Sequence, residues 1–296
     1  FYPAAFELTN VAVSNACGSF TYMDQPALSV RYQVEALNAT DDVTWNYDNA
    51  DLSVPVASVQ LLAEDADDGV PRTSRLSAAG SQWDDGEYLI DLNNVSFARL
   101  AAADGPFESL QLSVQVSDPQ DPIALKILDA RADTTGDCVV AGDCDAAALG
   151  ASVQLVYGRL LVLPSFGPEN LDLAIGLEAQ RFADGVFRAF PADNCSEYSA
   201  PRASLSSFTG NLASGETTVT VPLADTALVT GTADSDNPLQ LSAPGIGNDG
   251  TVEVQLDVDA WLEFDWQGTG LEDPRGIATF GRYRGHDRII FWREGR

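Results

Sequence analysis

Strict alternation of apolar and polar residues is the feature that most constrains the fold of this sequence. The stretch LQLSVQV at Leu110–Val116 shows it clearly, and further segments share it: Ala27–Ala36, Ser58–Ala63, Glu87–Leu92, Thr217–Val221 and Thr251–Val258. Because successive side chains of a β-strand point to opposite faces, this period places apolar residues on one face and polar residues on the other. Each segment is therefore predicted to be a half-buried β-strand.

Turn sequences separate these segments, and the helical signal is thin. Sequences such as DDG at 67–69 and NDG at 248–250 are typical of turns, whereas only Asp145–Leu149 is expected to form a single helical turn. Many short strands without intervening helices are typical of β-sandwiches. We therefore expect an all-β fold of two consecutive immunoglobulin-like β-sandwich domains with little helix.

The proline-containing segment DPQDP at 118–122 marks the expected domain boundary. The first domain is predicted to span 1–119 and the second 120–296. The second is expected to end in a β-hairpin with strands at Ala278–Arg284 and Arg288–Glu294. The last seventeen residues hold five of the sixteen basic residues of the chain. We expect these arginines to pair with the protein's own carboxylates, which suit bidentate contact, more readily than with an external anion.

The charge of the chain excludes several classes of partner. Its 44 acidic residues outweigh 16 basic ones, for a net charge of −28. Nucleic acids and anionic lipid headgroups are bound through lysine and arginine, so neither is an expected partner. Apolar runs are far shorter than the roughly 20 residues that a spanning helix needs, so direct membrane insertion is not expected. The composition fits a secreted protein kept soluble by its carboxylates, or a surface that recruits divalent cations.

Four cysteines, Cys17, Cys138, Cys144 and Cys195, allow three disulfide connectivities. Cys138 and Cys144 are close enough to staple a local loop, which would leave Cys17 to pair with Cys195. Zinc is the competing interpretation, but CVVAGDC lacks the usual ligand spacing and a second ligand pair. Disulfides are favoured, and they predict an oxidising compartment outside the cytoplasm.

Catalytic motifs are hard to find in this sequence. His286 is the only histidine, and no serine lies in a GxSxG motif. Paired carboxylates of the glycosidase type are not excluded, but so many acids are present that choosing a pair would be arbitrary. We expect a protein that is not an enzyme.

Calcium is the cofactor that the acidic loops favour. Three loops gather oxygen ligands of the kind that hard cations prefer, although none follows the EF-hand pattern. The predicted ligands are Asp65 and Asp67, Asp133 and Asp137, and Asp265 and Asp273. The alternative is that each loop is a solvated acidic turn without an ion.

Two tryptophan-containing segments lie next to polar or acidic residues, at Trp45–Tyr47 and Trp83–Asp85. They could form a platform on which sugars stack. A tryptophan at a strand end more often closes the core of a sandwich, and this is the interpretation we favour.

A series of motifs follows the chain from end to end: FYPAAFEL near the start, ACGSFTYMDQPALSVRYQVEALNA at 16–39, WNY at 45–47, VSFAR at 95–99, DGPFESLQLSVQVSD at 104–118, YGRLLVLPSFGPENLDLAIGLEAQRF at 157–182, DNC at 193–195 and WLEFDWQGTGLEDPRGIATFGRYRGHDRIIFWRE at 261–294. In this order they resemble the C-terminal region of MshQ-type proteins, encoded with the MSHA (mannose-sensitive haemagglutinin) type IV pili of Gram-negative bacteria. The resemblance implies a secreted, non-enzymatic β-rich module at the pilus or cell surface. The resemblance also implies that longer relatives are modular proteins with a lectin-like domain ahead of this region.

Three functions remain open at this point. The first is an extracellular module of a pilus-associated surface protein that supports adhesion or pilus assembly, with pilus or other surface proteins as partners. The second is a structural subunit that polymerises with copies of itself, in which FYPAAFEL would be the donor for strand addition to a sheet edge. The third is a calcium-dependent carbohydrate-binding domain with glycans as partners.

Overall fold

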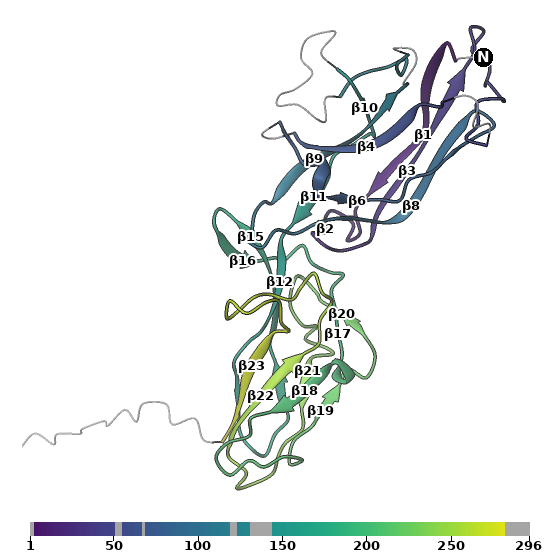
Figure 1. The fold of residues 1–296 in the computed structure, drawn as a ribbon. Coiled ribbons are helices and arrows are strands. Elements are labelled where there is room, and N and C mark those ends of the chain that lie inside the picture. Colours follow the sequence, from purple (N-terminus) through teal and green to yellow (C-terminus); the bar gives the residue numbers. More distant parts are fainter. Residues whose placement is uncertain (1–2, 51–54, 67–68, 119–122, 131–143, 282–296) are drawn as a thin grey trace, which may run out of the picture. The chain divides into compact units, whose positions relative to one another are not determined.

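The computed structural model describes residues 3–50, 55–66, 69–118, 123–130 and 144–281 (Figure 1). The protein is all-β, as its alternating segments predict. Helix within these residues is confined to two three-residue 3-10 turns, η1 (Thr73–Arg75) and η2 (Ala200–Arg202). No helix in the described part of the chain is long and apolar enough to cross a membrane.

The chain divides into two compact units. The first comprises Phe1–Gly158 and Arg181–Arg188, and the second comprises Arg159–Gln180 and Ala189–Arg296. This division differs from the boundary expected at 119/120. The reason is that two short strands beyond that point, β10 (Ala147–Ala148) and β11 (Val153–Val156), hydrogen-bond to β9 (Phe107–Ser117) and so complete a sheet of the first unit.

The first unit contains two sheets. One has the order β1–β3–β8–β6, with β7 also paired to β8. Its strands are β1 (Ala5–Ser14), β3 (Leu28–Leu37), β6 (Leu76–Ser77), β7 (Trp83–Asp84) and β8 (Glu87–Phe97). The other has the order β2–β11–β9–β4–β5, with β10 also paired to β9. Its remaining strands are β2 (Thr21–Tyr22), β4 (Ser58–Asp65) and β5 (Val70–Pro71).

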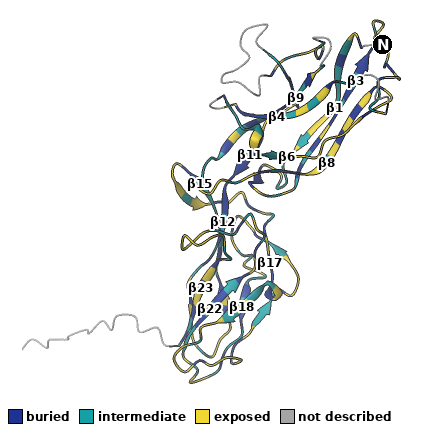
Figure 2. Ribbon diagram, viewed as in Figure 1, coloured by how far each residue is buried: buried dark blue, intermediate teal, exposed yellow. Residues whose placement is uncertain are grey.

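The core of the first unit lies between these sheets, where the buried residues of Figure 2 gather. Phe97 of β8 and Phe107 of β9 meet edge to face with ring centroids 5.5 Å apart, so they join the two sheets directly. At the other end, the Trp83 ring lies 5.5 Å from Phe6 and 4.9 Å from Tyr47. Such aromatic pairs add specific geometry to the burial of apolar area.

The second unit contains several smaller sheets. One has the order β13–β23–β22–β18, one β14–β21–β19, and one is the pair β17–β20. Their strands are β13 (Ser165–Gly167), β14 (Leu173–Ile175), β17 (Glu197–Tyr198), β18 (Ala203–Ser206), β19 (Val219–Val221), β20 (Thr226–Ala227), β21 (Leu239–Leu241), β22 (Gly250–Leu256) and β23 (Arg275–Phe280). The sheet of order β12–β15–β16, with bounds Gly158–Val162, Leu177–Ala183 and Val186–Ala189, contains residues assigned to each of the two units.

Each alternating segment of the sequence overlaps a strand of the structure. The helical turn expected at Asp145–Leu149 is wrong, because Ala147 and Ala148 form β10 against Val114 and Ser113. Of the predicted C-terminal hairpin, the first strand overlaps β23 as far as Phe280. The second strand, Arg288–Glu294, lies outside the described residues.

The proposed donor strand FYPAAFEL needs a correction. Its residues from Ala5 onward belong to β1, which pairs with β3 of the same chain from Ala5↔Leu37 to Ser14↔Ser29. Across its other edge, Phe6 exchanges backbone hydrogen bonds with the segment Ala124–Lys126. This segment is therefore part of its own sheet and not a strand available for donation.

Candidate functional site

Part of one edge of strand β4 has no partner strand among the described residues, and the hydrogen-bond pattern of β4 shows which residues face outward. The carbonyl of Ala63 accepts a hydrogen bond from the N–H of Arg72 at 2.7 Å, and the N–H of Ala63 donates to Oγ1 of Thr73 at 3.0 Å. Both backbone groups of Ala63 thus point away from β9. Residues of an antiparallel strand alternate in this respect. Since the register from Ser58↔Ser117 to Asp65↔Leu110 is unbroken, Val59 and Leu61 point outward as Ala63 does.

No described strand pairs with Val59 or Leu61 on this side, because β5 pairs only with Glu64 and Asp65. We call the outward-facing side of Ser58–Ala63 the β4 edge. A row of unpaired N–H and C=O groups is a ready template for another strand. Proteins commonly protect such edges with charges, proline or a covering loop. Within Ser58–Ala63 there is neither a charged residue nor a proline.

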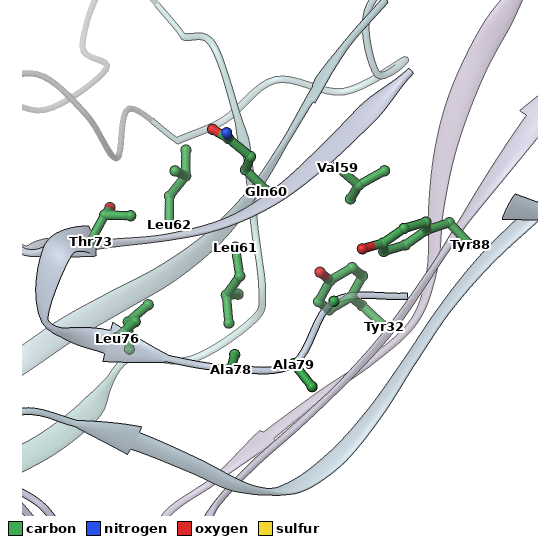
Figure 3. A pocket seen from close by; sticks show the side chains of 11 residues that line it. Tyr32, Val59, Gln60, Leu61, Leu62, Thr73, Leu76, Ala78, Ala79 and Tyr88 are labelled. Carbon is green, nitrogen blue, oxygen red and sulfur yellow. The ribbon is translucent and has the colours of Figure 1, made fainter. Parts of the chain in front are cut away.

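A cavity of about 330 Å³ lies beside the β4 edge (Figure 3). Its walls are β4 on one side and the segment Leu76–Gly80 on the other, and Tyr32 of β3 and Tyr88 of β8 reach it from the facing sheet. The lining combines aliphatic side chains with the polar groups of Tyr32, Tyr88, Gln60 and Thr73. Leu61 projects from β4 toward the opposite wall, as Figure 3 shows. We call this space the edge cavity.

The two tyrosine hydroxyls of the edge cavity differ in their partners. The hydroxyl of Tyr88 accepts a hydrogen bond from the backbone N–H of Ser81 at 2.9 Å. Tyr32 is only 2% exposed, and its hydroxyl has no hydrogen-bond partner among the described residues. Desolvation, followed by the neighbouring Tyr88, raises the pKa of Tyr32 well above its ordinary value. Tyr32 therefore stays a neutral hydroxyl that points into the cavity and lacks a partner (Figure 3).

Three carboxylates converge near one end of the β4 edge. Oxygen atoms of Asp48, Asp84 and Asp85 lie within 4.8 Å of one another, and Asp84 and Asp85 are exposed. We call these three residues the acidic cluster. It is the only group of three such ligands among the described residues. Like charges this close favour a cation, either a metal ion or the guanidinium of an arginine.

The position of the acidic cluster is set by Trp83. The indole Nε1 of Trp83 donates to the carbonyl of Ala57 at 2.8 Å, directly before β4 begins. The backbone N–H of Trp83 donates to Oδ1 of Asn49 at 2.6 Å, and the N–H of Asn49 donates to the carbonyl of Trp83 at 3.1 Å. These bonds hold the loop of Asp48 beside Asp84 at the Ser58 end of the β4 edge.

The predicted calcium ligands do not form this cluster. Asp65 is buried, with its carboxylate 4.0 Å from the guanidinium of Arg72. Asp273 accepts hydrogen bonds from Gln255 Nε2 and from the N–H of Val258, both at 3.1 Å. Asp67, Asp133 and Asp137 lie outside the described residues. Calcium binding therefore stays a prediction.

Asp265 lies in one of these acidic loops and accepts hydrogen bonds from the backbone of that loop. Desolvation alone would raise the pKa of its carboxyl group, but the backbone N–H groups of 267–270 lower the pKa below its ordinary value. One of them, the N–H of Thr269, donates to Oδ1 of Asp265 at 2.9 Å. This carboxylate organises its own loop by accepting backbone hydrogen bonds.

The described cysteines are all oxidised. Cys17, Cys144 and Cys195 are disulfide-bonded, whereas Cys138 lies outside the described residues. The turn at Cys195 is held by the buried Asp193, whose Oδ1 accepts the N–H of Cys195 at 3.0 Å and that of Ser196 at 2.9 Å. The connectivity itself stays a prediction.

The tryptophan-containing segments have mixed positions. Trp83 and Tyr47 are each 2% exposed and belong to the core, in agreement with the favoured interpretation. Trp45 is 74% exposed, so the favoured core interpretation is wrong for this residue. Glycan binding stays a prediction.

Comparison with known proteins places the chain in a family of multidomain proteins. The chain shares 13% identity with the adhesin InvE of Yersinia pseudotuberculosis at a TM-score of 0.27, over 93% of this chain and 58% of that one. A likeness this weak carries no argument about fold or function. None of the curated proteins matches. The domain model described as "DUF6701, third domain" matches residues 1–145, and "DUF6701, fourth domain" matches residues 156–295. The chain therefore belongs to the DUF6701 family, of which it carries the third and fourth domains.

Proposed function

We propose that this chain is a non-enzymatic extracellular module of a pilus-associated surface protein, which supports adhesion or pilus assembly by binding other protein chains. The observation that carries the proposal is the β4 edge with its adjoining cavity. Strand addition to an open edge supplies main-chain hydrogen bonds, and a pocket beside it selects the side chains of the incoming strand. This combination suits a protein partner.

The cysteines and the charge support the extracellular part of the proposal. Disulfides persist in oxidising compartments and are rare in the cytosol, and Cys17, Cys144 and Cys195 are all disulfide-bonded. A net charge of −28 keeps an exposed module soluble and discourages nonspecific association.

The experiment is a comparison of two strains of the producing bacterium, the parent and one that lacks the segment coding for residues 1–296. We expect antibodies against the chain to label intact parent cells, and the deletion strain to adhere less to a host surface at equal growth. Labelling only after lysis, or equal adhesion of the two strains, would contradict the proposal. Counting pili by microscopy separates a defect in adhesion from one in assembly.

A second candidate function is a subunit that assembles with copies of itself, and the β4 edge favours this as well. Purified chain should then associate in a concentration-dependent manner when followed by sedimentation velocity. Val59→Pro removes an outward N–H and should weaken the association, whereas Val59→Thr keeps the N–H and should not. A monomer at all concentrations would eliminate this second function.

A further inference from the structure

The β4 edge sets three requirements for the strand that would occupy it. The strand must cover Val59 and Leu61, so it needs at least five residues, or roughly 17 Å of extended chain. It must place a large side chain in the edge cavity, where aliphatic residues alternate with the polar groups of Tyr32 and Tyr88. It also benefits from a cation near the Ser58 end, where the acidic cluster lies.

The sequence RIIFWRE at Arg288–Glu294 meets these requirements. Its four central residues are β-branched or aromatic, which are the types enriched in strands, and arginines flank them on both sides. The segment 282–296 contains five arginines and two acidic residues, in a chain of net charge −28. By contrast, the segment 131–143 has one arginine and three acidic residues, which the acidic cluster would repel.

The cavity contributes a specific argument for Trp292. A buried indole needs an acceptor for its N–H. The side chain of Tyr32 is 2% exposed, and its hydroxyl points into the edge cavity and has no partner among the described residues. An indole in the cavity would donate its N–H to this hydroxyl, so both groups would gain a hydrogen-bond partner. A hydrogen bond between these two groups favours the docked state.

The spacing of Arg288 and Trp292 matches the positions of the acidic cluster and the edge cavity along β4. Residues four apart in a strand share one face and lie roughly 13 Å from each other. With Trp292 in the cavity beside Leu61, Arg288 extends along the same face toward the Ser58 end and the acidic cluster. A planar guanidinium is suited to bidentate contact with carboxylates.

We propose that the β4 edge of one copy binds the segment Arg288–Glu294 of a second copy as an added strand. This inference rests on the second proposed function, assembly with copies of the chain, and names the segment that carries it. The edge belongs to the first unit and the segment follows the second unit, so each copy carries one donor and one acceptor. Contacts of this head-to-tail kind build rings or open filaments.

The test is photo-crosslinking in a mixture of two isotopic forms of the full chain. The crosslinking residue p-benzoylphenylalanine replaces Ile290, which lies between Arg288 and Trp292 on the same face of an extended strand, and equal amounts of ¹⁴N and ¹⁵N protein are mixed and irradiated. We expect crosslinked peptides that join a ¹⁴N segment to a ¹⁵N β4 edge, at Ser58–Leu62 or at Leu76–Gly80. Crosslinks confined to one isotope would show that the segment docks within its own chain. Absence of crosslinks to these residues would also overturn the inference.

Substitutions test separately whether the donor segment and the β4 edge contribute to self-association. Trp292→Ala and Arg288→Glu should each weaken self-association at least tenfold, which corresponds to about 1.4 kcal/mol. Arg282→Ala, outside the proposed strand, is the matched control and should have little effect. If Val59→Pro weakens association while Trp292→Ala and Arg288→Glu do not, the donor named here is wrong but assembly through the edge stands. Circular dichroism of each variant verifies that it is folded.

Discussion

Tyr88 and Ser81 are joined by a hydrogen bond of 2.9 Å between the tyrosine hydroxyl and the backbone N–H of the serine. The bond ties the segment that follows β6 to strand β8. That segment forms the outer wall of the edge cavity, so the shape of the cavity depends on this contact. The neighbouring Tyr32 has no such partner among the described residues.

Removal of the Tyr88 hydroxyl is expected to destabilise the first unit. In Tyr88→Phe the N–H of Ser81 loses its acceptor, which should lower the free energy of unfolding by about 1 kcal/mol. Amide exchange at Ser81 should become faster. Tyr32→Phe is the matched control, because its hydroxyl makes no hydrogen bond in the described structure and its loss should cost nothing. Urea denaturation measures the free energy of unfolding, and hydrogen-exchange mass spectrometry measures the exchange at Ser81. If the two variants lost equal stability, the hydrogen bond assigned to Tyr88 would be contradicted.

The ion pair of Arg75 and Asp104 is expected to be one of the strongest polar contacts of the first unit. Nη1 and Nη2 of Arg75 contact the two carboxylate oxygens of Asp104 at 2.5 and 3.2 Å, and the Arg75 side chain is 9% exposed. The guanidinium also stacks 4.3 Å from the Phe97 ring centroid. Asp104→Ala would leave the buried guanidinium without its carboxylate. Asp104 itself is 30% exposed, which reduces the effect, so we expect the free energy of unfolding to fall by about 2–4 kcal/mol.

The matched control for this prediction is Asp91→Ala, which breaks the pair with Arg31. Both side chains of that pair are more than half exposed, so its loss should cost less than about 1 kcal/mol. Denaturant midpoints of the two variants provide the comparison. If Asp91→Ala lowered the free energy of unfolding as much as Asp104→Ala, burial would not decide the strength of these ion pairs.

Asp225 should contribute a pH-dependent part of the stability of the second unit. The hydroxyl of Ser199 donates to its Oδ1 at 2.7 Å, and Arg202 contacts both oxygens, so its pKa lies below the ordinary value. A lowered pKa in the folded state means that the stabilisation is present above about pH 4, the pKa of an unfolded aspartate, and is lost as pH falls through the folded pKa.

NMR titration of the Asp225 carboxyl carbon checks this directly, and its midpoint should lie below that of a free aspartate. Asp225→Asn should reduce the dependence of Tm on pH in the acid range. Asp236→Asn is the control, since Asp236 is exposed and has no ion pair within the described residues. An unchanged acid profile in Asp225→Asn would argue against the assigned contacts.

Local pattern predicted the strands of this protein but not how they pair. The alternation in Ser58–Ala63 is enough to indicate a strand, yet nothing in it shows that one side lacks a neighbour. That depends on β9, some fifty positions away, and on the shortness of β5. The division into units differs from the expected boundary for the same reason, because β10 and β11 are too short to show a period and pair with β9.

The candidate site was only partly visible in the sequence. Asp84 and Asp85 stood out beside Trp83, but Asp48 joins them through hydrogen bonds between Asn49 and Trp83 that no local pattern encodes. The alternating pattern of Ala27–Ala36 placed Tyr32 in a strand, but its missing partner depends on the whole environment of its hydroxyl. Charge density alone pointed to loops such as that of Asp265, whose carboxylate accepts hydrogen bonds from its own backbone.

The outward orientation of Val59 can be tested by placing proline at successive positions of β4. An edge strand tolerates proline where the N–H faces solvent, because no hydrogen bond of the ladder is lost. Val59→Pro should therefore change the free energy of unfolding of the monomer only slightly. Gln60, by contrast, lies opposite Gln115 and directs its backbone groups toward β9.

Gln60→Pro should remove a ladder hydrogen bond and leave a carbonyl of β9 without its donor, at a cost of about 1–3 kcal/mol. The measurement is urea denaturation at protein concentrations low enough to keep the chain monomeric, since self-association would mask the difference. The two substitutions share the same residue type, so any effect of proline on the unfolded chain largely cancels. If Val59→Pro were the more damaging of the two, the alternation of β4 would be opposite to that described, and Ser58, Gln60 and Leu62 would form the open edge.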